Sequence, residues 1–582
     1  MTDLSSKLSS KFTLQLDDSR RLTGANLLGD FTGAIMDVSI SNIDADVVVK
    51  AWEKHAKQLL ERIGWDWHKE KCFHLVFEGG ASLAVTAPID ALYTATDINE
   101  AAWELTRKEL FQIRSDNFMV ELGNLINRLQ AAVESEQNPA LIALQQRAKK
   151  ENVVFLSDDD EASIGYGKHC QIYPIDKIPN PDDINWQQAR RIPVAIVTGT
   201  NGKSTTVRLA DSVAKAANKS CGITSTDYIR VGEKILDTGD YSGPGGARML
   251  LRHPDTEVAF LEVARGGLLR RGIGINQASA VAITNVAKDH LGQYGINTLA
   301  DMVETKFIVR QAINEQQALI LNADDAGCVD FARSLLQHPQ QSHNIVWFSW
   351  SHDNPLIQQH IENDGTVCYI EDDTLYYHTA KIKTAIISVS DIPITLNGAA
   401  KHNIHNALTV VALCFSLGFK QQHIAKGLKQ FSISPDDNPG RGNLFELNGY
   451  QAIVDFAHNE HGLKVMAETI KNMPAKRRLI MLGQAGDRSD SAIQDAVKAA
   501  INAQPNVLIL CEVDCYLRGR KAGELSKLMQ QTAMQQGMKA EQIILVKSSV
   551  EGAKKALEWA QADDLLLLIT LDSRDEIIKL LS

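Results

Sequence analysis

The sequence predicts an α/β protein of several domains, with a small N-terminal α+β domain ahead of two units built on parallel strands. Three observations lead to this fold class. First, 582 residues, 44% of them hydrophobic, can bury about three or four separate cores. Second, short apolar strands alternate with amphipathic helices after residue 187. Third, a glycine-rich turn joins the strand 194–197 directly to a helix.

Composition narrows the classes of function. The 60 basic and 71 acidic residues give a net charge of −11, which disfavours nucleic acid and acidic membrane surfaces as partners. The first ten residues are polar, and no segment approaches the roughly 18 apolar residues of a membrane span. The cysteines are scattered, and Cys511 and Cys515 lack a second pair that would complete a zinc site. We therefore expect a soluble, cytoplasmic protein without nucleic-acid or membrane partners.

The N-terminal part mixes strand-like segments with apolar-periodic helices over its first 130 residues, as in a small α+β domain. A helix-like segment, 140–150, and a short strand, 153–156, follow. An acidic run at 158–161 and three prolines between 174 and 181 then mark a connection. The pattern predicts an N-terminal domain at 1–165, a linker at 166–186, a central domain at 187–441 and a C-terminal domain at 442–582.

Strand candidates continue through both later domains. Their alternation with helices predicts a mainly parallel sheet with helices on both faces in the central domain, and a smaller Rossmann-like sheet in the C-terminal domain. Besides 194–197, we expect central strands at 258–261, 280–283 and 318–321, and C-terminal strands at 453–456, 478–482, 507–510 and 565–569.

The turn after strand 194–197 has the features of a phosphate-binding loop. Its spacing is G-x2-G-K-S, shorter than the standard G-x4-G-K-[ST] because Val197 stands where the longer pattern has glycine. Glycines let backbone N–H groups approach phosphate oxygens, the following helix start adds a positive field, and Lys203 neutralises charge. A plain strand-to-helix turn would leave this lysine unexplained. We expect nucleotide phosphates to contact Gly199, Thr200, Asn201, Gly202, Lys203, Ser204 and Thr205, with the Ser204 hydroxyl on Mg²⁺.

The shortened loop resembles that of the Mur ligase superfamily, the ATP-dependent ligases of peptidoglycan precursors and folylpolyglutamate. In that family ATP phosphorylates a substrate carboxylate, and an amine then displaces phosphate from the acyl phosphate. The chemistry is reasonable because a carboxylate is a poor acyl donor until it carries a leaving group. The resemblance implies a C–N ligase that uses ATP and Mg²⁺.

Further segments follow in the order of that family. By resemblance, Glu262 and His290 ligate magnesium, although Glu262 alone could be an ordinary carboxylate at a strand end. Lys306 lies where many members carry a carbamate; a plain lysine contacting phosphate or carboxylate, or a solvated one, would also fit. The remaining roles implied by resemblance are Asn322 near the nucleotide, Asn403 at adenine, Arg441 at the phosphates, Asp455 at the ribose and His458 near the reacting phosphate, where Glu460 replaces the usual proline.

Within the superfamily, the segments EVARGG, GDYSGP, NPGRGNLF, GDRSD and LRGR look like the ligase half of the cyanophycin synthetases, and 21–26 looks more weakly like their first domain. In that branch a segment like 164–169 opens an ATP-grasp domain. Here the phosphate loop begins about 30 residues later, which leaves no room for that domain. The chain thus resembles the shortened cyanophycin synthetase 2 class, and the linker stands where the missing domain would be.

That resemblance implies a substrate of amino-acid, dipeptide or peptide-polymer type, with β-aspartyl-arginine as the leading hypothesis. A ligase for another amine and carboxylate, or an inactive binding or regulatory module, are the alternatives; the presence of Lys203, Glu262 and His290 weighs against the inactive module. We also expect a homo-oligomer, and the resemblance implies polymer docking on the N-terminal domain. Arginines could bind substrate carboxylates bidentately, although surface ion pairing is as plausible for each. The candidates are Arg265, Arg488, Arg518 and Arg520.

Overall fold

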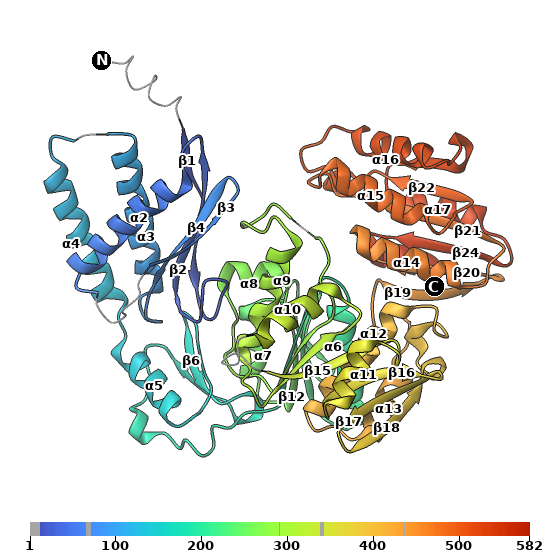
Figure 1. Ribbon diagram of the computed structural model, residues 1–582, viewed down its shortest axis with the longest axis horizontal. Coiled ribbons are helices and arrows are strands. Elements are labelled where there is room, and N and C mark those ends of the chain that lie inside the picture. Colours follow the sequence, from blue (N-terminus) through green and yellow to red (C-terminus); the bar gives the residue numbers. More distant parts are fainter. Residues whose placement is uncertain (1–11, 66–71, 114, 290, 338–342, 436) are drawn as a thin grey trace, which may run out of the picture.

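The computed structural model describes residues 12–65, 72–113, 115–289, 291–337, 343–435 and 437–582 (Figure 1). The N-terminal part forms an antiparallel sheet in the order β1-β2-β4-β3. Helices α2 and α3 cover this sheet, and α4 packs outside on α3. The bounds are β1 Thr13–Leu22, β2 Gly33–Ser41, α2 Ala45–Arg62, β3 Cys72–Phe77, β4 Gly80–Thr86, α3 Leu92–Leu110 and α4 Phe118–Glu136.

A small three-stranded sheet follows, and its last strand lies where the sequence predicted a linker. Helix α5 (Pro139–Lys150) packs on β5 (Phe155–Ser157), β6 (Glu161–Ile164) and β7 (Gln171–Pro174). Strand β7 lies inside the stretch 166–186, so this stretch is not a plain connection. Its own apolar side chains give it a core against α5: Tyr173, Ile175, Ile178, Ile184 and Trp186.

The central sheet has eleven described strands in the order β11-β10-β9-β12-β8-β13-β14-β15-β16-β17-β18. The strands from β9 to β16 in this order are parallel, whereas the strands at each edge are antiparallel. The bounds are β8 Val194–Thr198, β9 Cys221–Thr224, β10 Tyr228–Val231, β11 Lys234–Thr238, β12 Val258–Glu262, β13 Ala280–Ile283, β14 Ala318–Asn322, β15 Asn344–Ser349, β16 Thr366–Glu371, β17 Thr374–Thr379 and β18 Ile382–Ser388.

Helices cover both faces of this sheet because successive strand residues point to opposite sides. Ile196 packs with α7 to α11 on one face, whereas its neighbours Ala195 and Val197 pack with α6, α12 and α13 on the other. The bounds are α6 Lys203–Ala216, α7 Pro244–Arg252, α8 Arg265–Arg271, α9 Leu299–Phe307, α10 Ala326–Leu336, α11 Pro355–Glu362, α12 Lys401–Ser416 and α13 Gln421–Gln430.

The C-terminal part is a second, smaller α/β unit, drawn in orange and red in Figure 1. Its sheet runs β19-β20-β24-β21-β22-β23, parallel except for β19. Helices α14 to α16 cover one face, and α17 and α18 the other. The bounds are β19 Arg441–Leu447, β20 Tyr450–Asp455, α14 Glu460–Asn472, β21 Arg477–Gly483, α15 Asp490–Ile501, β22 Val507–Cys511, α16 Glu524–Gln535, β23 Ile543–Val546, α17 Ser549–Trp559, β24 Asp564–Ile569 and α18 Arg574–Leu581.

The expected α/β fold class is therefore confirmed, with the small α+β sheet in front and two mainly parallel sheets behind it. Among the described helices, none combines the length and the apolar character needed to cross a bilayer.

The N-terminal part is bonded to the end of helix α8. The backbone N–H of Thr23 donates to the carbonyl of Arg271 at 2.9 Å, and that of Ile273 donates to Ala25 at 2.7 Å. The guanidinium of Arg20 adds a hydrogen bond to the carbonyl of Leu269 at 3.2 Å. Because α8 begins at Arg265, three residues after β12, it connects the N-terminal part to the carboxyl end of the central sheet.

Candidate active site

A cavity of about 490 Å³ lies between the central and C-terminal units. It opens at the carboxyl ends of β8, β12 and β14, which is where open parallel sheets bind ligands. The start of α12 and the segment after β20 form the opposite walls. Most of the predicted site residues line it, namely Thr200, Asn201, Gly202, Lys203, Ser204, Thr205, Glu262, Asn322, Asn403, Arg441, Asp455 and His458.

The phosphate loop needs its two glycines for steric reasons. Gly199 has φ +150°, and a Cβ there would lie 1.9 Å from Oγ1 of Thr284. Gly202 has φ +86°, and a Cβ there would lie 2.3 Å from Oδ1 of Asn406. The hydroxyl of Thr284 also donates to the carbonyl of Asn201 at 2.7 Å. These contacts fix the loop between β13 and α12 while α6 begins directly behind it.

The ammonium of Lys203 is folded back onto this loop. It donates to the carbonyls of Gly199 at 3.1 Å and Thr200 at 3.0 Å. Burial lowers the pKa of Lys203, and the nearby carboxylate of Glu262 acts in the opposite direction. The lysine side chain thus lies at the point where the sequence predicts phosphate.

Glu262 ends strand β12 and is 1% exposed. Neither of its oxygens has a hydrogen-bond partner of good geometry among the described residues, although the Ser204 hydroxyl is near enough to favour the ionised form. Burial raises the pKa of Glu262, and Lys203 opposes this shift. A buried carboxylate with unused lone pairs beside a hydroxyl is a donor set that suits a hard divalent cation.

The proposed metal shell extends beyond what the structure describes, because His290 lies outside the described residues. Within the described ranges, no group of three or more His, Cys, Asp and Glu side chains is arranged to hold a metal ion. Glu262 and Ser204 are therefore the two predicted ligands whose positions can be assessed, and they share one cavity.

Lys306 does not line the cavity but is buried in α9, with 3% of its surface exposed. Burial lowers its pKa to about 7, and the positive charge of Lys203 contributes in the same direction. A substantial share of this amine is therefore neutral near pH 7. Only a neutral amine can react with an electrophile such as CO₂.

Arg441 and Asp455 face each other on neighbouring strands, as direct partners in the β19–β20 register. The Arg441 guanidinium also lies over the ring of Phe456, 5.0 Å from its centroid. Burial raises the pKa of Asp455 to about 6, while Arg441 and the N–H of Ala457, 2.7 Å away, favour its ionised form. Both predicted nucleotide contacts of the C-terminal side thus stand in the same cavity wall.

Two histidines of the C-terminal unit line the cavity. Nδ1 of His458 lies 3.1 Å from the carbonyl of Phe456, and burial lowers the His458 pKa to about 4, so this ring is neutral at pH 7. Nδ1 of His461 lies 2.7 Å from Nδ2 of Asn201 in the phosphate loop. Sequence reasoning missed His461. Its position one residue after the Glu460 departure was the available signal.

Asn403, predicted at adenine, and Asn322, predicted near the nucleotide, already have partners inside the protein. Asn403 donates to the carbonyl of Ile394 at 2.8 Å and accepts from Asn406 at 3.0 Å. Asn322 donates to the carbonyl of Thr284 at 2.9 Å. An amide has two N–H groups and two oxygen lone pairs, so each side chain keeps capacity for a ligand. Trp350 lines the same end of the cavity.

The four arginines predicted to bind substrate divide into two pairs. Arg265 and Arg488 both flank Asp289: Nη2 of Arg488 lies 3.7 Å from its carboxylate, which also acts on the Arg265 charge. Arg518 pairs with Asp487 at 2.7 Å, and Arg520 donates to the carbonyls of Gly486 and Arg488, both at 2.8 Å. The contacts of the second pair hold the 486–490 loop in place.

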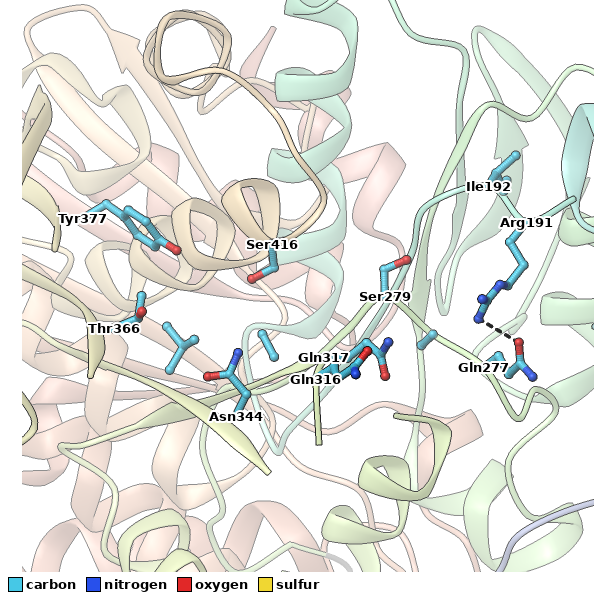
Figure 2. A pocket seen from close by; sticks show the side chains of 13 residues that line it. Arg191, Ile192, Gln277, Ser279, Gln316, Gln317, Asn344, Thr366, Tyr377 and Ser416 are labelled. Carbon is cyan, nitrogen blue, oxygen red and sulfur yellow. Dashed lines mark hydrogen bonds between the residues drawn. The ribbon is translucent and has the colours of Figure 1, made fainter. Parts of the chain in front are cut away.

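A second cavity, of about 470 Å³, opens at the opposite ends of the strands of the central sheet (Figure 2). It lies at the amino ends of β13, β14 and β15, where Arg191 donates to Gln277 at 2.8 Å. Its described lining contains amides and hydroxyls but no carboxylate, histidine or cysteine. Of these two cavities, only the first has carboxylates and histidines in its described lining.

Comparison with known proteins gives two domain matches, one after the other along the chain. Residues 197–414 match the Mur ligase middle domain, and residues 440–570 match the Mur ligase glutamate ligase domain. Cyanophycin synthetase from Synechocystis sp. is 33% identical over 391 residues, which are 67% of this chain and 44% of that protein. The corresponding protein of Crocosphaera subtropica is 35% identical over 58% of this chain and 38% of its own length. The chain therefore spans less than half of these relatives.

More distant relatives cover their own chains more fully. The UDP-N-acetylmuramoyl-L-alanyl-D-glutamate--2,6-diaminopimelate ligase of Clostridium botulinum is 22% identical over 79% of this chain and 90% of its own. Among solved structures, FolC of E. coli in complex with ADP covers 67% of this chain and 88% of its own, with a TM-score of 0.49 and 17% identity. With the middle and the glutamate ligase domains in succession, this protein belongs to the Mur ligase superfamily.

Proposed function

We propose that the protein is an ATP-dependent ligase that forms an amide bond through an acyl phosphate. The observation that carries this proposal is the single cavity in which Lys203 and Glu262 of the central unit face Arg441 and Asp455 of the C-terminal unit. A nucleotide held there would touch both units, and a carboxylate substrate could reach its terminal phosphate from the side of Glu262.

In the first step, a substrate carboxylate oxygen attacks the terminal phosphorus of ATP, and ADP leaves. The loop N–H groups and Lys203 hold the phosphate oxygens, and Arg441 adds a second positive charge from across the cavity. Ser204 and Glu262 would hold a divalent cation, which supplies further neutralisation of phosphate charge when bound. Asp455 would bind the ribose hydroxyls.

In the second step, an amine nitrogen attacks the acyl carbon, the C–O bond to phosphate breaks, and the nitrogen gives one proton to the departing phosphate. His458 is suited to orient the amine: with Nδ1–H directed at the Phe456 carbonyl, the tautomer inferred from this contact, Nε2 accepts a hydrogen bond. Closure of the two units over the cavity would keep water from hydrolysing the acyl phosphate.

For the substrate, we propose a β-aspartyl-arginine dipeptide or a related unit, which is joined into a cyanophycin-like product. Likeness to cyanophycin synthetases over 67% of this chain supports that choice, as do Arg265 and Arg488 beside Asp289. An arginine pair offers bidentate contacts to a carboxylate, and the carboxylate of Asp289 could meet a cationic side group. A ligase for a different amino acid or peptide is the alternative.

The test is a screen for ADP and phosphate release over amino acids and dipeptides, including β-aspartyl-arginine, with products identified by mass spectrometry. We expect release with β-aspartyl-arginine and a ligated product. Lys203→Ala should abolish release without changing the circular dichroism spectrum. The ligase proposal is wrong if no amino acid or dipeptide stimulates ADP release, and the substrate assignment is wrong if others do but β-aspartyl-arginine does not.

A further inference from the structure

Asp227, in the loop between β9 and β10, is shared by two arginines from different units. Its Oδ2 lies 2.5 Å from Nη2 of Arg208 in α6, the helix directly behind the phosphate loop. Its Oδ1 lies 3.2 Å from Nη1 of Arg574, the first residue of α18 in the C-terminal unit. One carboxylate thus joins the helix of the phosphate loop to the C-terminal unit.

Arg208 carries this connection to the segment between the two units. It is 1% exposed, and its Nη1 donates to Oδ1 of Asn438 at 3.1 Å. The amide of Asn438 in turn donates to the Thr205 hydroxyl at 3.2 Å and to the carbonyl of Arg441 at 3.1 Å. Asn438 therefore touches the phosphate loop with one bond and the backbone of Arg441 with another.

Arg574 approaches this connection closely because of two backbone features. Ser573, just before α18, has φ +52°, a left-handed conformation that is uncommon for residues other than glycine. Gly440 has φ +67°, and a Cβ there would lie 2.5 Å from Cδ of Arg574. The bend at Ser573 and the missing side chain at Gly440 let the Arg574 stem lie against the 438–441 segment while its guanidinium reaches Asp227.

The charges around Asp227 make its ionised form the stable one. Burial would raise the pKa of Asp227, but Arg208, Arg441 and Arg574 together hold it below its usual value. Arg574 also pairs with the exposed Asp575: Nε of Arg574 lies 3.0 Å from Oδ1 of Asp575, so Nη1 remains for Asp227. A partly buried carboxylate with several cationic neighbours is a stronger contact than an exposed pair.

From these contacts we infer that Arg574 and Asp227 are positioning residues for the nucleotide: their ion pair sets the distance between Arg441 and the phosphate loop. The inference rests on the proposed nucleotide site. The chain of contacts runs from Arg574 through Asp227, Arg208 and Asn438 to Arg441, and none of the first four needs to touch the nucleotide. Loss of the pair would leave the site intact but less often assembled.

A site assembled only part of the time shows a specific kinetic pattern. Its apparent affinity falls by the fraction of competent molecules, whereas saturating nucleotide restores assembly. Arg574→Gln should therefore raise KM for ATP by about fivefold and leave kcat within about twofold. Arg574→Lys, which keeps a point charge, should recover most of the effect. Lys579→Gln, on the exposed side of the same helix, is the matched control and should leave KM unchanged.

A double variant tests whether the two residues act as one unit. If Arg574 works through Asp227, then adding Arg574→Gln to Asp227→Asn should raise KM no further than Asp227→Asn alone does. Effects that multiply would overturn the inference, as would a loss of kcat at unchanged KM in Arg574→Gln. An unchanged KM in Arg574→Gln would overturn it directly.

A measurement without nucleotide separates this inference from the proposed function. Hydrogen exchange of the 437–443 amides in the ligand-free protein should be faster in Arg574→Gln than in the wild type, and Lys579→Gln should match the wild type. Equal exchange in all three proteins would show that the ion pair does not hold the 437–443 segment in place. If exchange changes but a fluorescent ATP analogue binds to none of the proteins, the nucleotide site is the part that fails.

Discussion

Lys203 and Glu262 are oppositely charged side chains that share one buried site. Burial lowers the pKa of Lys203 and raises the pKa of Glu262, and the charge of each side chain opposes the shift of the other. Lys203 donates to two carbonyls of its own loop, whereas the oxygens of Glu262 lack partners of good geometry among the described residues. The carboxylate of Glu262 therefore has unused lone pairs, and a bound cation would be a suitable partner for them.

This difference leads to a prediction for Glu262→Gln. An amide oxygen keeps the shape but not the charge, so the half-saturating Mg²⁺ concentration for ADP formation should rise by at least about tenfold. A Mg²⁺ titration of initial rates measures it. Glu257→Gln is the control, because Glu257 pairs with Lys168 near the opposite end of β12. An unchanged titration curve for Glu262→Gln would remove this residue from the metal shell.

Lys306 predicts a dependence of stability on pH. Its folded pKa of about 7 lies below the ordinary 10.5, so between these values the unfolded chain holds a proton that the folded chain lacks. The resulting cost is full below pH 7 and decreases as the pH rises toward 10.5. The wild type should therefore gain stability relative to Lys306→Met between pH 7 and pH 9. Urea unfolding of both proteins at each pH measures the difference; parallel curves would contradict the shifted pKa.

Sequence reasoning found the residues that carry a pattern and missed those that do not. Glu262 ends one strand of the central sheet and Lys203 begins the helix after another, so the rule for parallel sheets places both at the carboxyl ends of its strands. Asp455 likewise ends a strand of the C-terminal sheet. Asp227 and His461 have no such signal. Their partners in the other unit, Arg574 and Asn201, are 347 and 260 residues away in sequence, and only the packing of the two units brings these pairs together.

At the scale of single elements, the phosphate loop depends on a helix far along the chain. Gly202 leaves room for Asn406 at the start of α12, whereas Gly123, inside α4, has no atom within 4 Å of a Cβ. The two positions carry glycine for different reasons. One serves a close approach at a positive φ, and the other sits in a regular helix where glycine is merely unfavourable.

Alanine at these two positions should therefore have opposite effects. Gly202→Ala should lower the free energy of unfolding by about 1–3 kcal/mol and weaken ATP binding, because φ +86° and the contact with Asn406 both oppose a Cβ. Gly123→Ala should raise stability by about 0.5–1 kcal/mol and leave ATP binding unchanged. Chemical denaturation and nucleotide titration test both; equal stabilities would contradict the loop geometry.

Whether the sequence predicted a strand depended on how far that strand is buried. Strands β8, β12, β13 and β14 are buried on both faces and appear in the sequence as continuous apolar runs, which is why they were found. The antiparallel edge strands were missed because they mix polar and apolar residues, as in the exposed β11. The stretch 166–186 was read as a linker from its prolines, although its spaced aromatic and isoleucine side chains form a core.

For the whole molecule, the cavity between two units predicts that nucleotide binding stabilises both. A ligand that contacts only the folded state adds about 2.7 kcal/mol at a hundredfold excess over Kd. A non-hydrolysable ATP analogue with Mg²⁺ should thus raise the Tm of the wild type and slow proteolysis near residue 438. Lys203→Ala should show neither change. A higher Tm without protection at 438 would indicate binding to the central unit alone.

The contact between the N-terminal part and α8 has a consequence for protein engineering. A fragment starting at residue 187 would keep every predicted nucleotide contact but would remove Thr23 and Ala25 from the end of α8. The carbonyl of Arg271 and the N–H of Ile273 would lose their partners, so the C-terminal end of α8 would lose these hydrogen bonds to the N-terminal part. We therefore expect the N-terminal part to stabilise the candidate site, and substrate preference measured on the fragment to differ from that of residues 1–582.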